Sequence, residues 1–455
     1  MGTHITKPDE QCEQHWYAGL YSLPFLHSTT NYVRDLVPAR HPHVTPLRAQ
    51  NDWPPVVVAS VFQTGLNLMR DLLRRGVRVV GIDCDGSHEG FRSSYGKSYL
   101  CPNPDTNPDE WVAFMIDLAR RLGAKPVIIP AADIFVSALG RHAEALREQY
   151  IFSLESIAVQ AALATKEQQY ALAAHHGLPI PKSVYIQSRA DLEHFAGEAR
   201  FPCLIKPRHQ REWDALPAGN ALRGLKLKTS DTPEQMLADY SLTEPYRPEV
   251  MAQEIIAGGD DAKYCYLSVY GIGSRRLGHT VVHELRAHPV LFGSGSIVEP
   301  VVDQEIAAVC DQFLRGIGYV GICEIEVKRD TRDGVVRMIE ANPRYSVTAD
   351  ASIYAGVEIG WLHYLDLIGQ PVEPIQATRF GFRHIVLRRD IPALPRYVER
   401  GILTWGQIRD TYRGKLAFFD FDLHDWRPTA TTLKGCARVV GGTVLRSLGL
   451  RRQLD

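Results

Sequence analysis

The sequence predicts an α/β protein in which a Rossmann-like unit precedes a larger α+β unit. The first unit alternates strand and helix: an apolar run at 56–60, helical spacing at 66–75 and a second apolar run at 77–83. The second unit is mostly strand-like, and an amphipathic helix at 301–317 leads into a strand pair at 321–344. The alternation predicts a parallel sheet covered by helices, whereas successive strands without helices between them predict an α+β arrangement.

Changes in composition divide the chain into four expected parts. These are an irregular extension at 1–52, the Rossmann-like domain at 53–155, the larger domain at 156–375 and a C-terminal extension at 376–455. Residues 435–455 are basic, apolar and predicted to be helical. Such a tail can lie on a membrane surface, but it is short and rich in glycine, so packing against the body of the protein or a partner is favoured.

Composition excludes several classes of protein. The chain has 455 residues, 45% hydrophobic residues and a formal net charge of -1, so no overall field attracts nucleic acid. No apolar run reaches the ~20 residues of a transmembrane segment, and the N-terminus lacks the pattern of a secretory signal. The eight cysteines are dispersed without a CxxC motif, which fits a reducing compartment. We therefore expect a cytoplasmic protein without a nucleic-acid partner.

The strand pair at 321–344 carries the clearest chemical signal. Asp333-Gly334 supplies the turn, and period-two alternation places Glu340 and Asn342 on one face of the second strand. Glu326 belongs to the polar face of the first strand, so the two strands present the three side chains side by side. Two carboxylates and an amide oxygen are ligands that suit Mg²⁺. The alternative is a hairpin with a solvated polar face.

The Rossmann-like unit does not carry a dinucleotide fingerprint. Only Gly65 stands in its first strand-to-helix turn, so the backbone cannot approach a pyrophosphate as it does in that motif, and a nicotinamide site is disfavoured. Asp133 follows a strand at 126–130, at the edge where such sheets bind ligands, although it would serve equally well as a helix N-cap. His41-Pro42-His43 is more typical of a solvated loop than of a metal site.

The order of these parts resembles the ATP-grasp superfamily, most closely the carboxylate–amine ligases with an N-terminal pre-ATP-grasp domain. The resemblance covers roughly residues 55–430. It rests on five ordered motifs: Thr165-Lys166, the strand CLIKP ending near Lys206, QEIIAGGDD at 253–261, EIEV at 324–327 and IEANPR at 339–344. It implies a pre-ATP-grasp domain followed by a two-lobed ATP-grasp domain.

The resemblance also implies a role for individual residues. Those expected to bind ATP are Lys166 and Lys206 at the phosphates, Gln253, Glu254 and Ile256 around the adenine, and Asp260 or Asp261 at the ribose. Those expected to bind Mg²⁺, with Mn²⁺ as an alternative, are Glu326, Glu340 and Asn342. Arg344 and Arg286 are expected at the transferred phosphoryl group, and residues 208–223 would form a mobile lid.

The activity implied is formation of an amide from a carboxylate and an amine through an acylphosphate, with amino-acid-like substrates. A kinase, a carboxylate–thiol ligase and a non-catalytic nucleotide-binding protein are the alternatives. One departure concerns Glu284, since relatives often have a basic residue there, two positions before Arg286. Many members of the superfamily are dimers, so a homodimer is an arrangement that the resemblance allows, but no stretch indicates an interface.

Overall fold

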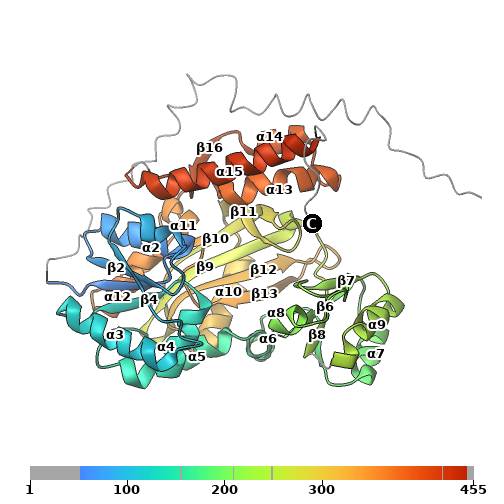
Figure 1. Ribbon diagram of the computed structural model, residues 1–455, viewed down its shortest axis with the longest axis horizontal. Coiled ribbons are helices and arrows are strands. Elements are labelled where there is room, and N and C mark those ends of the chain that lie inside the picture. Colours follow the sequence, from blue (N-terminus) through green and yellow to red (C-terminus); the bar gives the residue numbers. More distant parts are fainter. Residues whose placement is uncertain (1–51, 154–155, 209, 247–248, 423, 448–455) are drawn as a thin grey trace, which may run out of the picture.

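The computed structural model describes residues 52–153, 156–208, 210–246, 249–422 and 424–447, which form three β-sheets with helices around them (Figure 1). The expectations for residues 1–51, including the His41-Pro42-His43 loop, lie outside the described residues.

The first sheet is parallel, with strand order β3-β2-β1-β4. Its elements are β1 (Val56–Ala59), α2 (Gln63–Arg74), β2 (Val79–Asp83), η1 (Glu89–Arg92), β3 (Lys97–Leu100), α3 (Pro108–Leu122), β4 (Val127–Pro130) and α4 (Asp133–Leu146). β1 is fully buried because its apolar side chains pack against helices on both faces. The predicted strand, helix and strand at its start are confirmed.

The turn between β1 and α2 shows what Gly65 does. A Cβ atom on this residue would lie 1.8 Å from the carbonyl oxygen of Ser60, so the helix can start this close to the strand only with glycine. The carboxylate of Asp83, at the end of β2, accepts hydrogen bonds from the Val61 amide (2.8 Å) and the Ser60 hydroxyl (3.0 Å). The glycine and the acid thus hold the turn together, which argues against the nicotinamide alternative.

A second, smaller sheet is antiparallel, with order β5-β8-β6-β7. This small lobe contains β5 (Ser183–Ile186), α7 (Arg189–Glu198), β6 (Cys203–Pro207), α8 (Gln210–Asp214), β7 (Lys228–Ser230), α9 (Pro233–Ser241), η3 (Glu244–Tyr246) and β8 (Val250–Glu254). Helices α5 (Ile157–Leu163) and α6 (Lys166–His175) precede it. The expectation of a mobile lid at 208–223 is wrong, because α8 forms there and Trp213, Leu216 and Leu222 are buried in the core of the lobe.

The largest sheet has eight strands, ordered β13-β12-β9-β10-β11-β15-β16, with β14 paired to β10. Its strands are β9 (Lys263–Gly271), β10 (Arg275–His288), β11 (Ser294–Val301), β12 (Gly321–Arg329), β13 (Val336–Asn342), β14 (Ile375–Gln376), β15 (Phe382–Ile385) and β16 (Lys415–Phe418). The short 3₁₀ turns η4 (Asp260–Ala262) and η5 (Ile272–Ser274) flank β9, and its helices are α10 (Gln304–Gly316), α11 (Ala349–Ala355) and α12 (Ile359–Leu367). The predicted helix before β12 corresponds to α10.

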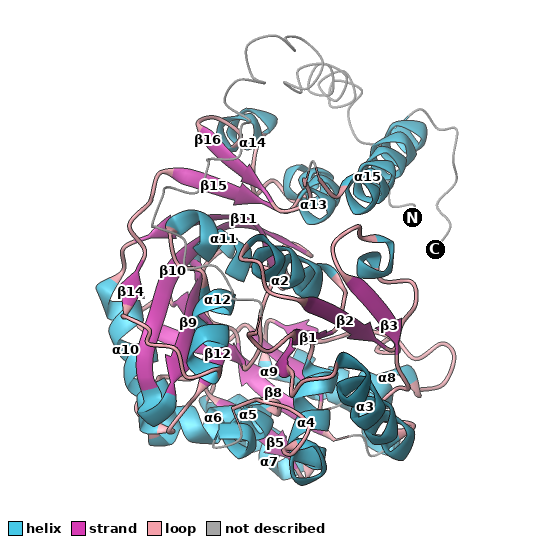
Figure 2. Cartoon of the chain, turned by 90° about the vertical axis from the view of Figure 1, so that its left-hand side faces the viewer, coloured by secondary structure: helices cyan, strands magenta, loops and turns pink. Residues whose placement is uncertain are grey.

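The C-terminal extension continues this sheet. β15 pairs with β11, and the helices α13 (Leu387–Glu399), α14 (Trp405–Thr411) and α15 (Trp426–Ser447) lie together along the same side of the molecule (Figures 1 and 2). The helical tail predicted at 435–455 is confirmed as far as residue 447, where the described part ends. No helix among the described residues has the length and apolar character needed to cross a lipid bilayer.

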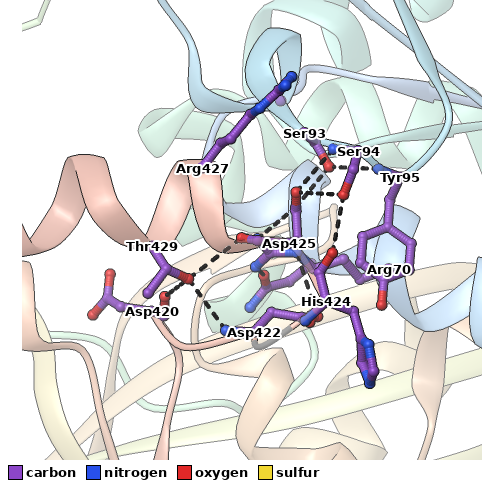
Figure 3. A network of polar contacts seen from close by, with 12 residues as sticks. Arg70, Ser93, Ser94, Tyr95, Asp420, Asp422, His424, Asp425, Arg427 and Thr429 are labelled. Carbon is purple, nitrogen blue, oxygen red and sulfur yellow. Dashed lines mark hydrogen bonds and ion pairs between the residues drawn. The ribbon is translucent and has the colours of Figure 1, made fainter.

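Buried polar contacts fasten the C-terminal extension to the first domain (Figure 3). The carboxylate of Asp425 accepts two hydrogen bonds from the Arg70 guanidinium, at 3.1 and 2.7 Å. It also accepts from the Ser93 hydroxyl (2.6 Å) and the Ser94 amide (2.8 Å). Asp425 is 1% exposed, and a charge this deeply buried is stable only with such partners. The extension is therefore a fixed part of the fold.

Candidate functional site

A cavity of about 640 Å³ lies between the small lobe and the large sheet. It is lined by the start of α6, by β6 and β8 of the small lobe, by β12 and β13 of the large sheet and by the loop between β10 and β11. Of the expected site residues, those that line it are Lys166, Lys206, Gln253, Glu254, Ile256, Glu326 and Glu340. Residues as far apart in the sequence as Lys166 and Glu340, which are 174 positions apart, therefore meet in one space, as the sequence motifs predicted.

The strand pair β12 and β13 brings the expected acids face to face. In the antiparallel register Glu326 is directly opposite Glu340, and Glu324 is directly opposite Asn342. Directly opposed residues have Cβ atoms about 5 Å apart. The prediction that Glu326, Glu340 and Asn342 lie side by side is thus confirmed, and Glu324 joins them as a fourth polar residue.

The pKa values of Glu326 and Glu340 are shifted in opposite directions. Burial raises the pKa of Glu326 well above its usual value, and the adjacent Glu340 carboxylate raises it further. Burial also acts to raise the pKa of Glu340, but the Lys166 ammonium, 3.0 Å away, together with Asn342 and Arg344, outweighs burial and lowers the value to about 2. Two carboxylates that face each other, of which Glu340 raises the pKa of Glu326, favour the binding of a further cation.

Lys166 and Lys206, the two lysines expected at the phosphates, also differ in their pKa values. Lys166 is the first residue of α6, where a positive charge opposes the helix dipole, so its place there does not serve helix stability. Burial lowers the pKa of Lys166, but Glu340, together with Tyr170 and Glu326, outweighs burial and raises the value to about 12. Burial, and then the charge of Lys166, lower the pKa of Lys206 to about 7. Lys206 therefore loses its proton near neutral pH unless an anion binds beside it.

Hydrogen bonds orient Lys206. Its ammonium donates to the Gln253 side-chain oxygen at 2.9 Å, and the Gln253 amide group donates to the Tyr170 hydroxyl at 2.9 Å. The Glu254 carboxylate, in contrast, accepts from the Arg200 amide at 2.8 Å, so its side chain holds the end of β8 rather than facing a ligand. The segment from Gln253 to Ile256 lines the cavity as one stretch.

Arg286 is not where it was expected. Its guanidinium is completely buried and makes two hydrogen bonds to the Asp390 carboxylate, at 2.9 and 2.7 Å, and a third to the Thr411 hydroxyl. It also lies over the ring of Tyr412. The expectation that Arg286 faces the phosphate and the acyl group is wrong, because Asp390 and Thr411 of the C-terminal extension already bind its guanidinium.

The two aspartates expected at the ribose also lie outside the cavity lining. Asp260 is 5% exposed, and its carboxylate accepts from the Tyr397 hydroxyl (2.5 Å) and the Leu291 amide (3.0 Å). It thus ties η4 to α13 and to the loop after β10, which overturns the expected ribose contact. Asp261 is exposed and contributes a backbone oxygen to a contact with His283.

Asn342 and Arg344 lie beyond the acids, at the end of β13. The Asn342 amide donates to Glu340 at 3.3 Å, and the Arg344 guanidinium donates to the Asn342 oxygen at 3.3 Å. Arg344 also pairs with Asp133 through two contacts, at 2.6 and 3.2 Å. Asp133 is the first residue of α4 and makes no capping bond, so its side chain serves this ion pair.

Other residues that line the cavity were not predicted from the sequence. Lys263 is 4% exposed, pairs with Glu284 at 2.7 Å and donates to the Gly293 carbonyl at 2.6 Å. The unexpected acid at position 284 therefore has its own buried cation. Lys328 and Phe292 also line the cavity. Lys263 comes three residues after Asp260, the first aspartate of the QEIIAGGDD motif, and its role was not recognisable in the sequence because its partner Glu284 lies on the neighbouring strand.

Comparison with solved structures identifies proteins with a similar fold. The chain aligns with N5-carboxyaminoimidazole synthetase from Staphylococcus aureus in complex with ADP (TM-score 0.55, 13% identity, 78% of this chain and 89% of that one). It also aligns with L-amino acid ligase from Bacillus licheniformis (TM-score 0.52, 12% identity, 70% and 75%). The chain has an ATP-grasp fold. The arrangement of one parallel sheet followed by two further sheets fits a pre-ATP-grasp domain together with an ATP-grasp domain.

Sequence comparison is consistent with this ATP-grasp fold. D-aspartate ligase from Enterococcus faecium is 23% identical over 257 residues, which are 54% of this chain and 60% of that protein. The match thus spans less than two thirds of the relative's length. No family model matches the chain.

Proposed function

We propose that this protein is an ATP- and Mg²⁺-dependent ligase that joins a carboxylate to an amine through an acylphosphate. The observation that carries the proposal is the pairing of Glu326 with Glu340 at the wall of a cavity that also contains Lys166 and Lys206. Phosphoryl transfer depends on positioned positive charge rather than on covalent chemistry by the protein. Two lysines beside two carboxylates supply that charge directly and through a metal.

The donor set suits magnesium. Glu326, Glu340 and Asn342 offer hard oxygen atoms from adjacent strands, and Mg²⁺ binds few protein groups and keeps other positions for water and phosphate. Burial, and then repulsion by Glu340, raise the pKa of Glu326, and a bound divalent cation would favour its charged form; Mn²⁺ would fit the same ligands. When bound, the ion would neutralise phosphate charge and orient the phosphates.

We assign the remaining roles from the positions of the side chains. Lys166 and Lys206 hold the phosphates, and the segment from Gln253 to Ile256 receives the adenine at the inner wall of the small lobe. Arg344, held by Asp133 and Asn342, lies next to the metal ligands and faces the phosphoryl group during transfer. Arg286, Asp260 and Asp261 have no part in this proposal.

The reaction proceeds in two balanced steps. A carboxylate oxygen forms a bond to the γ-phosphorus as the bond to the β–γ bridging oxygen breaks, which releases ADP. The amine nitrogen then attacks the acyl carbon, loses a proton and expels phosphate, which leaves the amide. Enclosure of the acylphosphate between the lobes protects it from water.

Amino-acid-like substrates are the class we favour. The relatives reported above include a D-aspartate ligase and an L-amino acid ligase, both named for substrates of this class. We place the activity in the cytoplasm, and the seven cysteines of the described part are free thiols, as a reducing compartment maintains. ATP and the two small molecules are the proposed partners.

Hydroxylamine provides a test that does not need the natural amine. The chain is incubated with Mg²⁺, ATP, hydroxylamine and each of a panel of D- and L-amino acids starting with D-aspartate, and ADP and hydroxamate are measured. The proposal expects equal amounts of both products for at least one carboxylate. Glu340→Gln should abolish both products, and Glu148→Gln, an exposed position (75%), should not.

The other outcomes separate the alternatives. ADP release with a carboxylate or hydroxyl compound but without hydroxamate would support a kinase and contradict the ligase. Product formation with coenzyme A thiols but not with amines would support a carboxylate–thiol ligase. ATP binding without turnover for the whole panel would support a non-catalytic protein.

A further inference from the structure

Charge is divided unevenly between the C-terminal extension and the rest of the chain. Residues 376–455 contain 15 Lys and Arg and 7 Asp and Glu, whereas residues 1–375 contain 36 and 45. The extension therefore has a formal net charge of +8 and the remainder has -9, although the whole chain is close to neutral. From Trp426 to Leu454 there are six Lys and Arg and no acid. This asymmetry indicates that the extension meets an anionic partner.

Helix α15 uses only one of its sides to pack against the protein. Pro428, Thr432 and Cys436, each four residues from the next, are buried on that side. The Thr432 hydroxyl accepts a hydrogen bond from Arg388 of α13, and Cys436 lies in one apolar cluster with Leu387. This contact is the packing against the body that the sequence favoured for the tail, and it leaves the other sides of the helix to be explained.

The side of α15 turned away from this contact carries an exposed apolar stripe. Trp426 is 64% exposed and Leu433 is 46% exposed, and their spacing of seven residues aligns them along the helix. Ala430 and Ala437 lie between and beyond them on the same stripe. In both views α15 lies at an outer edge of the described structure, so the stripe is open to a partner (Figures 1 and 2).

Three cations lie along one edge of this stripe. Arg427, Lys434 and Arg438 are exposed, and the helical period places all three on the same side of Trp426 and Leu433. None of the three forms an ion pair with an acid in the part of the chain that the structure describes. The Arg427 guanidinium is directed away from the buried network around the start of α15 (Figure 3) and lies 6.0 Å from the centre of the Trp426 ring. The charges are therefore available to an external anion.

We propose that α15 docks this protein onto an anionic membrane surface, with Trp426 and Leu433 among the lipid headgroups and the three cations at lipid phosphates. A helix with an apolar stripe, basic residues beside it and an indole at the boundary is typical of binding in the plane of a membrane. The two large apolar side chains expose far less than the ~800 Å² per partner that a stable protein–protein interface buries, which disfavours a second copy of the chain. The cytoplasmic leaflet carries anionic lipids, which agrees with the cytoplasmic location proposed above.

Flotation of the full chain with lipid vesicles tests the proposal. Vesicles of phosphatidylcholine with about 30% phosphatidylglycerol are compared with vesicles of phosphatidylcholine alone, at about 0.1 M and about 0.5 M NaCl, because salt screens exposed charges. Leu433→Gln and Lys434→Gln change the stripe and its basic edge. Leu242→Gln, 41% exposed on the small lobe, and Lys125→Gln, exposed in the first domain, are the matched controls. Thermal melting and light scattering are measured for each variant.

The wild-type chain is expected to bind the anionic vesicles at low salt, and to bind neutral vesicles, or anionic vesicles at high salt, at least roughly tenfold more weakly. Lys434→Gln should weaken binding roughly fivefold and Leu433→Gln roughly tenfold, with both controls within about twofold of the wild type. Lys434→Gln decides the matter if Leu433→Gln lowers the Tm.

Three results would overturn the inference. These are no binding to anionic vesicles, equal binding to both kinds of vesicle, and equal losses in the controls. A dimer in light scattering that Leu433→Gln dissociates would assign the stripe to a second copy of the chain and would overturn it as well. None of these outcomes depends on the ligase activity.

Discussion

Arg344, just after β13 of the large sheet, and Asp133, at the start of α4 beside the first sheet, form an ion pair with contacts of 2.6 and 3.2 Å. Arg344 is 19% exposed and also donates to Asn342, whereas Asp133 is 58% exposed. The aspartate therefore sets the direction of a guanidinium that adjoins the proposed metal ligands. The pair links the two domains at the point where the reaction would occur.

Asp133→Asn should lower kcat roughly 10- to 100-fold, because a catalytic group misplaced by an ångström loses that much. The free energy of unfolding should change by less than about 1 kcal/mol, since an ion pair this exposed adds little stability. Steady-state kinetics and urea denaturation measure the two effects. Asp117→Asn, at a surface ion pair on α3, is the matched control. A loss of stability without loss of kcat would show that the pair is only structural.

Glu340→Gln should remove a metal ligand and release Lys166 from its ion pair. Turnover should fall by more than roughly 100-fold, because even residues behind the ligands commonly contribute 10- to 100-fold. EDTA should abolish the activity of the wild-type chain, and Mg²⁺ or Mn²⁺ should restore it. Turnover that persists in EDTA would contradict the assignment of Glu326, Glu340 and Asn342 as metal ligands.

ATP binding should depend on pH through Lys206. Its pKa is about 7 without ligand, and neighbouring phosphate would raise it, so above pH 7 the lysine must take up a proton when ATP binds. Affinity should therefore fall by up to about tenfold per pH unit between pH 7.5 and 9. Calorimetry in buffers of different ionisation enthalpy measures the proton. Lys206→Arg, which stays charged, should bind with no such dependence; persistence of the dependence would place it on another group.

Arg286→Ala should destabilise the fold rather than remove a catalytic group. Both partners of the Arg286–Asp390 pair are completely buried, and loss of one partner of a buried pair costs about 3–5 kcal/mol. The double change Arg286→Met with Asp390→Leu should lose less than the sum of the single changes, because neither charge is left alone. Urea denaturation measures this, with Arg396→Ala as the exposed control. A single-variant loss no larger than that of the control would refute the structural role.

Local patterns in the sequence predicted which acids and lysines lie at the candidate site. The period-two alternation of 321–344 placed Glu326, Glu340 and Asn342 on one face, and the register confirmed it, since the side-chain direction of a strand follows from its residue count. Lys206, which the family resemblance placed at the phosphates, lines the same cavity as Glu326 and Glu340. The order of these motifs indicated an ATP-grasp fold, which the structural comparison bears out.

Only the tertiary structure decided which charges are free to act. Arg286 and Asp260 resemble active-site residues in the sequence, but α13 and the loop around it bind both through Asp390 and Tyr397, more than 100 residues away. The physical reason is that a residue's type sets the charge that it carries, whereas long-range packing sets whether that charge is already neutralised.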